Sequence, residues 1–123
     1  MAHKIVLIED DSALLDMYKI KFSESGFELF TASNGEEGLA LIQKEKPELA
    51  LVDIMMPKMD GFAVLKVLRQ DPATKDMPVL LLTNLGQKSD IDKGKELGAT
   101  DYIVKASMTP AQVVEQIKKH IKI

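Results

Sequence analysis

Residues 49–61 read Leu-Ala-Leu-Val-Asp-Ile-Met-Met-Pro-Lys-Met-Asp-Gly, and this stretch decides the fold. Four apolar residues lead directly into Asp53. An apolar run without alternation is typical of a strand that is buried on both faces, as in a parallel sheet. Asp53 then stands at the carboxyl end of that strand, where open α/β sheets bind ligands. Pro57 and Gly61 interrupt regular structure beyond it, so we predict that a stiff strand presents Asp53 to a loop.

The sequence on either side of this strand alternates between apolar runs and amphipathic stretches. Further strands are predicted at 5–8, 27–32, 79–82 and 102–104. Helices are predicted at about 12–25, 34–45, 60–71, 87–97 and from 109 onward. Such alternation requires a parallel sheet with helices on both faces and right-handed crossovers. The prediction is an α/β, flavodoxin-like (βα)5 fold: a doubly wound five-stranded parallel sheet with strand order 2-1-3-4-5.

Capping residues set the predicted helix boundaries. Asp11 or Ser12 is expected to cap the first helix. The sequence Thr-Pro-Ala-Gln at 109–112 combines a cap, a proline at the first helical position and a glutamine that closes a capping box. The helix predicted at 87–97 is the weakest, because its apolar face is thin and Gly94 in its interior costs about 1 kcal/mol relative to alanine.

Length, charge and composition exclude several classes of protein. At 123 residues the chain is expected to form one domain, residues 1–123, without an appended output domain. A net charge of −3 gives no electrostatic reason to expect direct nucleic-acid binding. The absence of cysteine excludes disulfides and thiolate chemistry. No apolar run approaches the roughly 18–20 residues that span a bilayer, and no signal-peptide pattern is present, so we expect a cytoplasmic protein without membrane insertion.

Polar side chains follow four of the five predicted strands: Glu9 and Asp10, then Asp53, Thr83 and Lys105. In the predicted topology they meet at one edge of the sheet. Three crowded carboxylates repel one another, and Mg²⁺ is the usual cation that neutralises them when phosphate is a further ligand. A metal ion and an ammonium group beside one aspartate are what phosphoryl transfer requires, because the protein mainly positions groups and neutralises charge. We therefore interpret Asp53 as a nucleophile for a phosphoryl group.

In this combination and order, the residues resemble the receiver domain of two-component response regulators, of the stand-alone chemotaxis-regulator type. The resemblance covers essentially the whole chain. It rests on Glu9-Asp10, on Asp53 with Met56-Pro57-x-Met59-Asp60-Gly61, on Thr83 and on Lys105. It implies a single-domain phosphoacceptor that takes a phosphoryl group from a histidine kinase or a histidine phosphotransfer protein. Such a protein is no enzyme in the ordinary sense, since it catalyses only its own phosphorylation and dephosphorylation.

The resemblance also implies a metal site. Asp10 and Asp53 would bind Mg²⁺ directly, together with the backbone carbonyl of Met55. Glu9 would act on the ion through a water molecule. Met55 is a bulky apolar side chain beside the site and cannot orient a water molecule for hydrolysis of the acyl phosphate.

Further roles implied by the resemblance concern the phosphoryl group and the response to it. Thr83 and the backbone amide of Asn84 would bind the phosphoryl oxygens, and Lys105 would pair with them. Tyr102 matches the aromatic residue whose ring turns inward when the threonine moves toward the phosphoryl group. The surface formed by the fourth helix, fifth strand and fifth helix would then be read by a downstream protein of unknown identity. The same surface is a candidate dimer interface, although the sequence does not show whether the protein dimerises.

One departure from the family concerns Ala106, which stands where the family usually has proline, often after a cis peptide bond. A cis bond without proline costs about 3 kcal/mol, so we expect none here. This departure keeps open a second reading, an inactive receiver used only as an interaction module.

Two other classes fit the sequence less well. An aspartyl-phosphate phosphatase of the haloacid dehalogenase type needs a second acid two residues after its nucleophile, where this chain has Met55. A flavodoxin-like cofactor binder needs a first loop rich in Ser, Thr and Gly to hold a phosphate, whereas this chain has three consecutive acids at 9–11.

Overall fold

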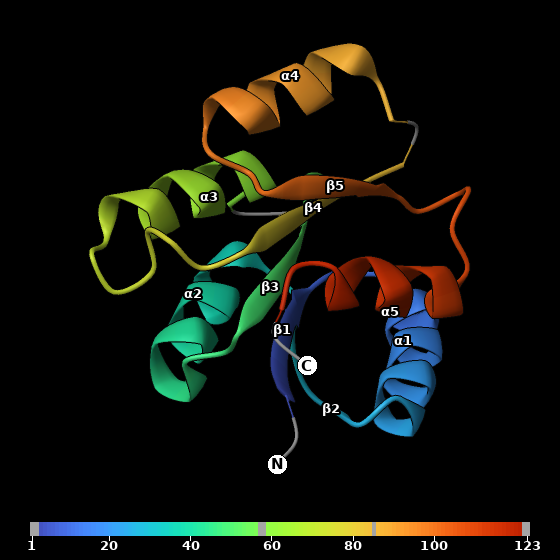
Figure 1. Cartoon of the computed structure of the whole chain (residues 1–123). Coiled ribbons are helices and arrows are strands. Elements are labelled where there is room, and N and C mark those ends of the chain that lie inside the picture. Colours follow the sequence, from blue (N-terminus) through green and yellow to red (C-terminus); the bar gives the residue numbers. More distant parts are fainter. Residues whose placement is uncertain (1–2, 57–58, 85, 122–123) are drawn as a thin grey trace.

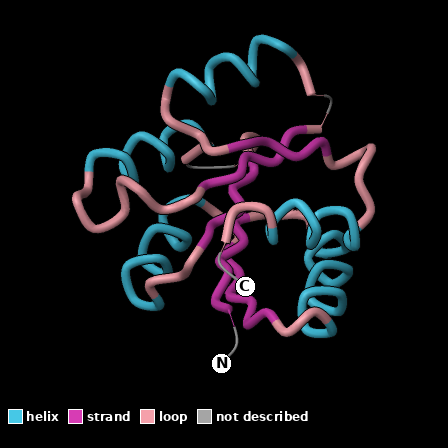
Figure 2. Tube along the Cα trace, viewed as in Figure 1, coloured by secondary structure: helices cyan, strands magenta, loops and turns pink. Residues whose placement is uncertain are grey.

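The computed structural model describes residues 3–56, 59–84 and 86–121. Its strands are β1 (His3–Ile8), β2 (Phe27–Ala32), β3 (Leu49–Asp53), β4 (Val79–Thr83) and β5 (Asp101–Val104). The helices that alternate with them are α1 (Ser12–Glu24), α2 (Gly35–Glu45), α3 (Gly61–Gln70), α4 (Lys88–Glu96) and α5 (Pro110–Lys118). The strands pair in parallel in the order β2-β1-β3-β4-β5, so the predicted flavodoxin-like α/β fold is confirmed (Figures 1 and 2).

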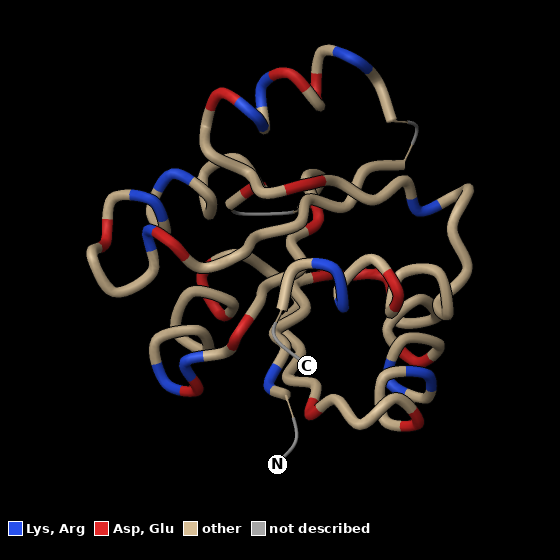
Figure 3. The backbone as a smooth tube through the Cα atoms, in the orientation of Figure 1, with Lys and Arg blue, Asp and Glu red and all other residues tan. Residues whose placement is uncertain are grey.

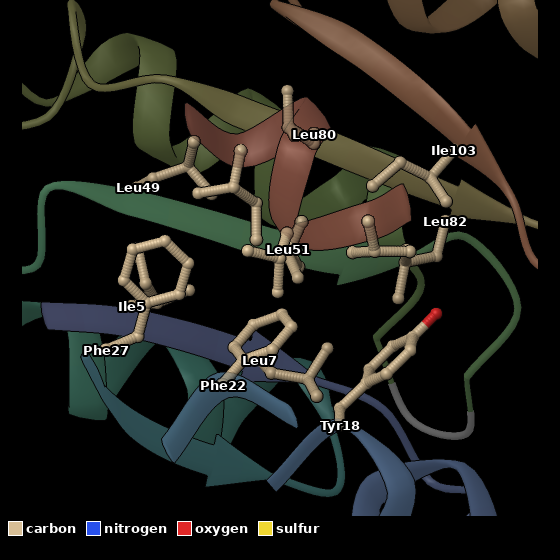
Figure 4. Close-up of a cluster of buried hydrophobic side chains, with 13 residues drawn as sticks. Ile5, Leu7, Tyr18, Phe22, Phe27, Leu49, Leu51, Leu80, Leu82 and Ile103 are labelled. Carbon is tan, nitrogen blue, oxygen red and sulfur yellow. The ribbon is translucent and has the colours of Figure 1, made fainter. Parts of the chain in front are cut away.

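Helices cover both faces of the sheet, which explains why its strands are apolar without alternation. On one face, α1 and α5 pack against strand side chains that include Leu7, Leu51 and Leu82 (Figure 4). On the other face, α2 and α3 pack against the intervening strand residues, such as Val6 and Val52. Because successive residues of a strand point to opposite sides, each central strand must be apolar along its whole length.

The predicted helix caps are present. The Oδ1 of Asp11 accepts hydrogen bonds from the backbone N–H groups of Ala13 and Leu14 at 3.0 and 3.2 Å. Thr109 and Gln112 form the reciprocal capping box at the start of α5. These contacts use N–H groups that the first turn of a helix leaves without partners, and so fix where α1 and α5 leave the sheet.

The helix α4 has fewer buried residues than any other helix and lies beyond α3, beside the edge strand β5 (Figure 1). Gly94 is the one buried residue within α4. A Cβ atom at this position would lie 2.6 Å from Cδ1 of Leu81, so the glycine permits close contact between α4 and β4. The sequence-based view of Gly94 as only a cost to the helix was therefore incomplete, because helix propensity takes no account of what the helix packs against.

Two further expectations concern the backbone and the membrane. The peptide bond between Lys105 and Ala106 is trans, as is every other peptide bond that the structure describes. Across those same residues, no helix combines the length and the apolar character that crossing a bilayer would require.

Candidate functional site

The ends of four strands meet at one edge of the sheet and bring the predicted acids and the lysine together. The register pairs Ile8 with Val52 and Thr83 with Val104, so β1, β3, β4 and β5 end side by side. Side chains at these ends, or directly after them, therefore gather in one cluster. The structure places four of the predicted site residues in mutual contact or close proximity there: Glu9, Asp10, Asp53 and Lys105.

Lys105 connects two of the carboxylates. Its Nζ donates a hydrogen bond of 2.8 Å to Oδ2 of Asp53 and lies 2.7 Å from Oε2 of Glu9. The contact with Glu9 lacks the alignment of a hydrogen bond, and the described residues offer Oε2 no other donor. Glu9 is fully buried and Asp53 is only 2% exposed, so bulk water does not solvate their charges and Lys105 is their counter-charge.

Burial changes the protonation of these groups. It raises the pKa of Glu9 to about 7, and the charge of Asp53 acts in the same direction, while Lys105 opposes both. Burial alone would lower the pKa of Lys105, but its contacts with Asp53 and Glu9 outweigh burial and raise that pKa. Lys105 is therefore a permanent cation at neutral pH, whereas Glu9 exchanges its proton close to neutrality.

The loop after β3 holds the Asp53 side chain in place. The backbone N–H of Met55 donates a hydrogen bond of 3.2 Å to Oδ1 of Asp53. The start of α3 packs directly on the Asp53 backbone, where a Cβ atom at Gly61 would overlap the carbonyl oxygen of Asp53. Asp60 caps α3 by accepting from the N–H of Ala63 at 2.9 Å. Glycine at 61 is thus required by close packing, which allows a helix to begin immediately beside the acid.

Three carboxylates are arranged as a metal ion would require. Glu9, Asp10 and Asp53 each offer an oxygen, and these oxygens lie within 4.8 Å of one another. Asp10 is exposed, so solvent and ions reach the cluster from its side. With all three acids ionised and Lys105 protonated, two negative charges stay uncompensated. A hard divalent cation such as Mg²⁺ matches both that charge and the oxygen donor set.

Thr83 and Asn84 lie next to this cluster. The Thr83 hydroxyl is largely buried and accepts a hydrogen bond of 3.3 Å from the backbone N–H of Gly86. Asn84 is exposed. Both residues line a hollow of about 180 Å³ together with Met55, which follows Asp53 in the chain. A phosphoryl group on Asp53 would therefore have polar groups of β4 on one side.

Tyr102 lies apart from the acids, with 37% of its surface exposed. It lines a second cavity of about 50 Å³ beneath α4, and Thr83 and Gly94 line the same cavity. Thr83 thus faces both the hollow beside Asp53 and the cavity beside Tyr102. Movement of Thr83 would change the shape of both cavities, because packed interiors transmit displacements.

Two features of α1 were not predicted from the sequence. Helical periodicity places Tyr18 on the buried face of α1, yet its hydroxyl is buried without a hydrogen-bond partner in the described chain. Met17 and Ile20 are 50% and 65% exposed although both are large and apolar. Helical periodicity could have predicted the exposure of Met17 and Ile20, since these two residues lie off the buried stripe of α1. The unpartnered Tyr18 hydroxyl could not be predicted, because periodicity does not show whether a hydroxyl has a hydrogen-bond partner.

Comparison with known proteins gives a family and a fold. The response regulator receiver domain family matches residues 5–118. The DNA-binding dual master transcriptional regulator RpaA of Synechocystis is 42% identical over 102 residues, which is 83% of this chain and 42% of RpaA. This chain spans about half the length of the curated relatives that it matches.

Two solved structures are similar over nearly the whole chain. The chemotaxis response regulator CheY4 of Vibrio cholerae superimposes with a TM-score of 0.91 at 28% identity, covering 98% of this chain and 100% of that one. The beryllofluoride-activated receiver domain of Klebsiella pneumoniae RstA gives a TM-score of 0.89 at 30% identity, covering 98% and 100%. With the family match to residues 5–118, this likeness shows that the chain belongs to the receiver domains of two-component response regulators.

Proposed function

We propose that Asp53 accepts a phosphoryl group from a phosphohistidine of a histidine kinase or histidine phosphotransfer protein, in a reaction that depends on Mg²⁺. The observation that carries this proposal is the contact between the Lys105 ammonium and the Asp53 carboxylate, 2.8 Å apart, at the edge of a cluster of three acids. An ordinary surface acid has neither the burial nor the fixed cation. Lys105, Asp10 and Glu9 supply Asp53 with the surroundings of a phosphoacceptor.

In this mechanism one carboxylate oxygen of Asp53 attacks phosphorus in line with the leaving imidazole nitrogen. An acyl-phosphate O–P bond forms as the P–N bond breaks. The electron pair of the P–N bond returns to the imidazole nitrogen. Asp10, Asp53 and the backbone carbonyl of Met55 would hold Mg²⁺, with Glu9 acting through water; the bound ion supplies neutralisation of the phosphoryl oxygens. Lys105 neutralises a further oxygen.

On the β4 side of the site, the Thr83 hydroxyl and the backbone N–H of Asn84 donate to the phosphoryl oxygens. These two groups recognise the phosphoryl group once it is on Asp53.

Exposed apolar side chains on α1 support contact with a protein phosphodonor. Met17 and Ile20 line an open groove of about 380 Å³ together with residues 109–111, which begin α5 after the Lys105 loop. Burial of these side chains would contribute roughly 25 cal/mol per Å² of apolar surface. A helical phosphodonor that covers this groove would bring its histidine to the strand ends.

The output proposed for this domain is protein contact through α4, β5 and α5, in response to movement of Thr83 and Tyr102. Tyr102 borders the small cavity beneath α4, and its ring would turn toward that side. RpaA is described as DNA-binding, but direct contact with DNA is not proposed for residues 1–123. Their net charge is −3, and acidic and basic residues are interspersed along the backbone (Figure 3).

Incubation with acetyl phosphate and Mg²⁺, followed by intact-protein mass spectrometry, tests the phosphoacceptor role. We expect a mass gain of one phosphoryl group that disappears in EDTA and in the Asp53→Asn variant. The matched control is Asp60→Asn, which changes a nearby acid that caps α3 and should retain the gain. An unmodified wild-type protein would overturn the proposal and leave the interaction-module reading.

A further inference from the structure

Two buried side-chain atoms in the described chain have no hydrogen-bond partner: the Tyr18 hydroxyl and Oε2 of Glu9. One is a donor with a proton to give, and the other is a carboxylate oxygen whose one polar contact among the described residues is the Lys105 ammonium, 2.7 Å away. A buried polar atom without a partner is costly, so groups of this kind are rare in folded proteins. The Tyr18 hydroxyl and Glu9 Oε2 are a complementary donor and acceptor near one reactive site, which indicates a role for the pair.

Tyr18 lies on the same side of the sheet as Glu9 and Lys105. Its ring belongs to the cluster between the sheet and α1 and α5, which includes Leu7 and Ile103. Glu9 follows Leu7 by two positions and Lys105 follows Ile103 by two, and alternate residues of a strand share a face. Glu9 and Lys105 therefore lie on the same side of the sheet as the strand residues that Tyr18 contacts.

The Tyr18 ring extends toward the end of β4 (Figure 4). In Figure 4 the hydroxyl lies beside Leu82, the last residue of β4 before Thr83. The ring stacks on Phe22 with centroids 5.6 Å apart, and this packing prevents it from turning away. Tyr18 is only 1% exposed, so solvent does not satisfy the hydroxyl.

The charges of the site act on this hydroxyl. Burial raises the pKa of Tyr18 to about 12, with the negative charge of Glu9 adding to the rise and the positive charge of Lys105 opposing it. The hydroxyl therefore keeps its proton at neutral pH and serves as a donor. Both charged groups are within electrostatic reach of it.

In the unphosphorylated protein, Lys105 forms ion pairs with both Glu9 and Asp53. Oε1 of Glu9 already accepts from the backbone N–H of Asp11 at 3.1 Å, but Oε2 depends on Lys105 alone among the described residues. If the ammonium moves toward a phosphoryl group on Asp53, Oε2 loses that contact, and a further donor would stabilise the buried carboxylate.

We propose that Tyr18 is a positioning residue whose hydroxyl donates a hydrogen bond to Glu9 when Lys105 turns to the phosphoryl group, which rests on the proposed function of Asp53. The hydroxyl has no partner among the described residues in the resting state, and it gains one in the phosphorylated state. Tyr18 thereby favours the phosphorylated arrangement of Lys105 without touching the phosphoryl group.

The test compares wild type with Tyr18→Phe, which removes one hydroxyl and retains the ring. Calorimetric titration with Mg²⁺ and beryllofluoride, a phosphoryl mimic, should show binding weakened by about tenfold in the variant, the effect of one hydrogen bond to a charged group. Affinity for Mg²⁺ alone should change less than about twofold, because without a phosphoryl mimic Lys105 stays with Glu9 and the hydroxyl is not called on as a donor. The melting temperature without ligands should be equal or higher.

Thr74→Val is the matched control, since it also removes a buried hydroxyl but one that donates to the Leu68 carbonyl at 2.6 Å, away from the site. It should lower the melting temperature and leave beryllofluoride affinity unchanged. A second arm uses Glu9→Gln, in which the effect of Tyr18→Phe on beryllofluoride affinity should shrink. In the wild type, tyrosine labelled with ¹³C at Cζ should show a Tyr18 shift on beryllofluoride binding that Mg²⁺ alone does not produce.

The outcomes separate this inference from the function on which it rests. Beryllofluoride binding that is equal in wild type and Tyr18→Phe overturns the role of Tyr18 and leaves the phosphoacceptor intact. A parallel loss of resting stability and binding in the variant assigns Tyr18 to packing and overturns the inference as well. Wild-type protein that binds no beryllofluoride and takes no phosphoryl group from acetyl phosphate removes both.

Discussion

At the scale of single residues, Lys105 reaches both Glu9 and Asp53, and the burial of these acids decides how the site responds to pH and to charge removal. Both acids are shielded from bulk solvent, since Glu9 is fully buried and Asp53 nearly so. Their free energies therefore depend on one ammonium group and on any bound cation. Two predictions follow from this dependence, one for each acid.

Glu9 should make the metal-free protein less stable as the pH rises. Its pKa is raised from 4.5 to about 7 in the folded protein, so between these values the folded state binds more protons than the unfolded state. Stability is then lost as pH rises through this window, on the order of 3 kcal/mol in total. Urea unfolding in EDTA across the window measures this loss. Glu9→Gln should remove it, and an identical pH dependence in that variant would contradict the assignment.

Asp53→Asn should raise the stability of the metal-free protein by on the order of 1 kcal/mol, because it removes one of three clustered negative charges. In that variant Lys105 keeps its ion pair with Glu9. Thermal melts of both proteins in EDTA measure the change. Asp16→Asn on the exposed face of α1 is the control and should shift the midpoint little. An unchanged or lowered midpoint in Asp53→Asn would show that the Lys105 contact outweighs the repulsion.

At the scale of secondary-structure elements, α4 is the one most open to movement. It contributes a single buried residue, and the cavity beneath it borders Tyr102. Its C-terminal end is tied to α3 by Arg69, whose Nε donates to the Gly98 carbonyl at 2.8 Å. The same guanidinium donates to the carbonyls of Thr74 and Met77. Elements with few buried contacts have low local stability, as a switching surface requires.

Gly94→Ala should fail to stabilise α4, although alanine is favoured over glycine in a helix by about 1 kcal/mol. The added Cβ would lie 2.6 Å from Cδ1 of Leu81 and force α4 away from β4. Urea unfolding should show a loss of stability. In a Leu81→Ala background, which removes the opposing atom, the same change should become stabilising. Stabilisation by Gly94→Ala in the wild-type background would show that α4 yields at no cost.

Arg69→Lys should loosen the C-terminal end of α4, because one ammonium cannot replace a guanidinium that reaches three carbonyls. Amide hydrogen exchange at residues 97–100 should accelerate by about tenfold, in keeping with the loss of one or two hydrogen bonds. Lys66→Gln, an exposed change on the same helix, serves as the control. Unaltered exchange at 97–100 in Arg69→Lys would remove the anchoring role.

At the scale of the whole molecule, the fold followed from patterns that have a direct physical cause. Continuous apolar runs predicted the strands, since a sheet covered on both faces buries every strand residue. The alternation of strands and helices predicted the strand order. It also predicted that acids after β1 and β3 would meet, since parallel strands end at the same edge.

Other features of the site could not be predicted from the sequence. The contact of Lys105 with Glu9 depends on the path of a flexible side chain, and the unpartnered Tyr18 hydroxyl depends on what lies above its ring. Periodicity assigns a residue to a face but does not determine its neighbours. The packing role of Gly94 was missed for the same reason, because it depends on the distance between α4 and β4.

The central claim is that one particular carboxylate, that of Asp53, becomes an acyl phosphate, and reduction with borohydride tests it most directly. Borohydride converts a phosphorylated aspartate to homoserine, which peptide mass spectrometry locates in the sequence. After treatment with acetyl phosphate and Mg²⁺, the account predicts homoserine at position 53 and at no other acid of the cluster. Homoserine at position 10, or none at all in protein that has gained a phosphoryl group, would contradict it.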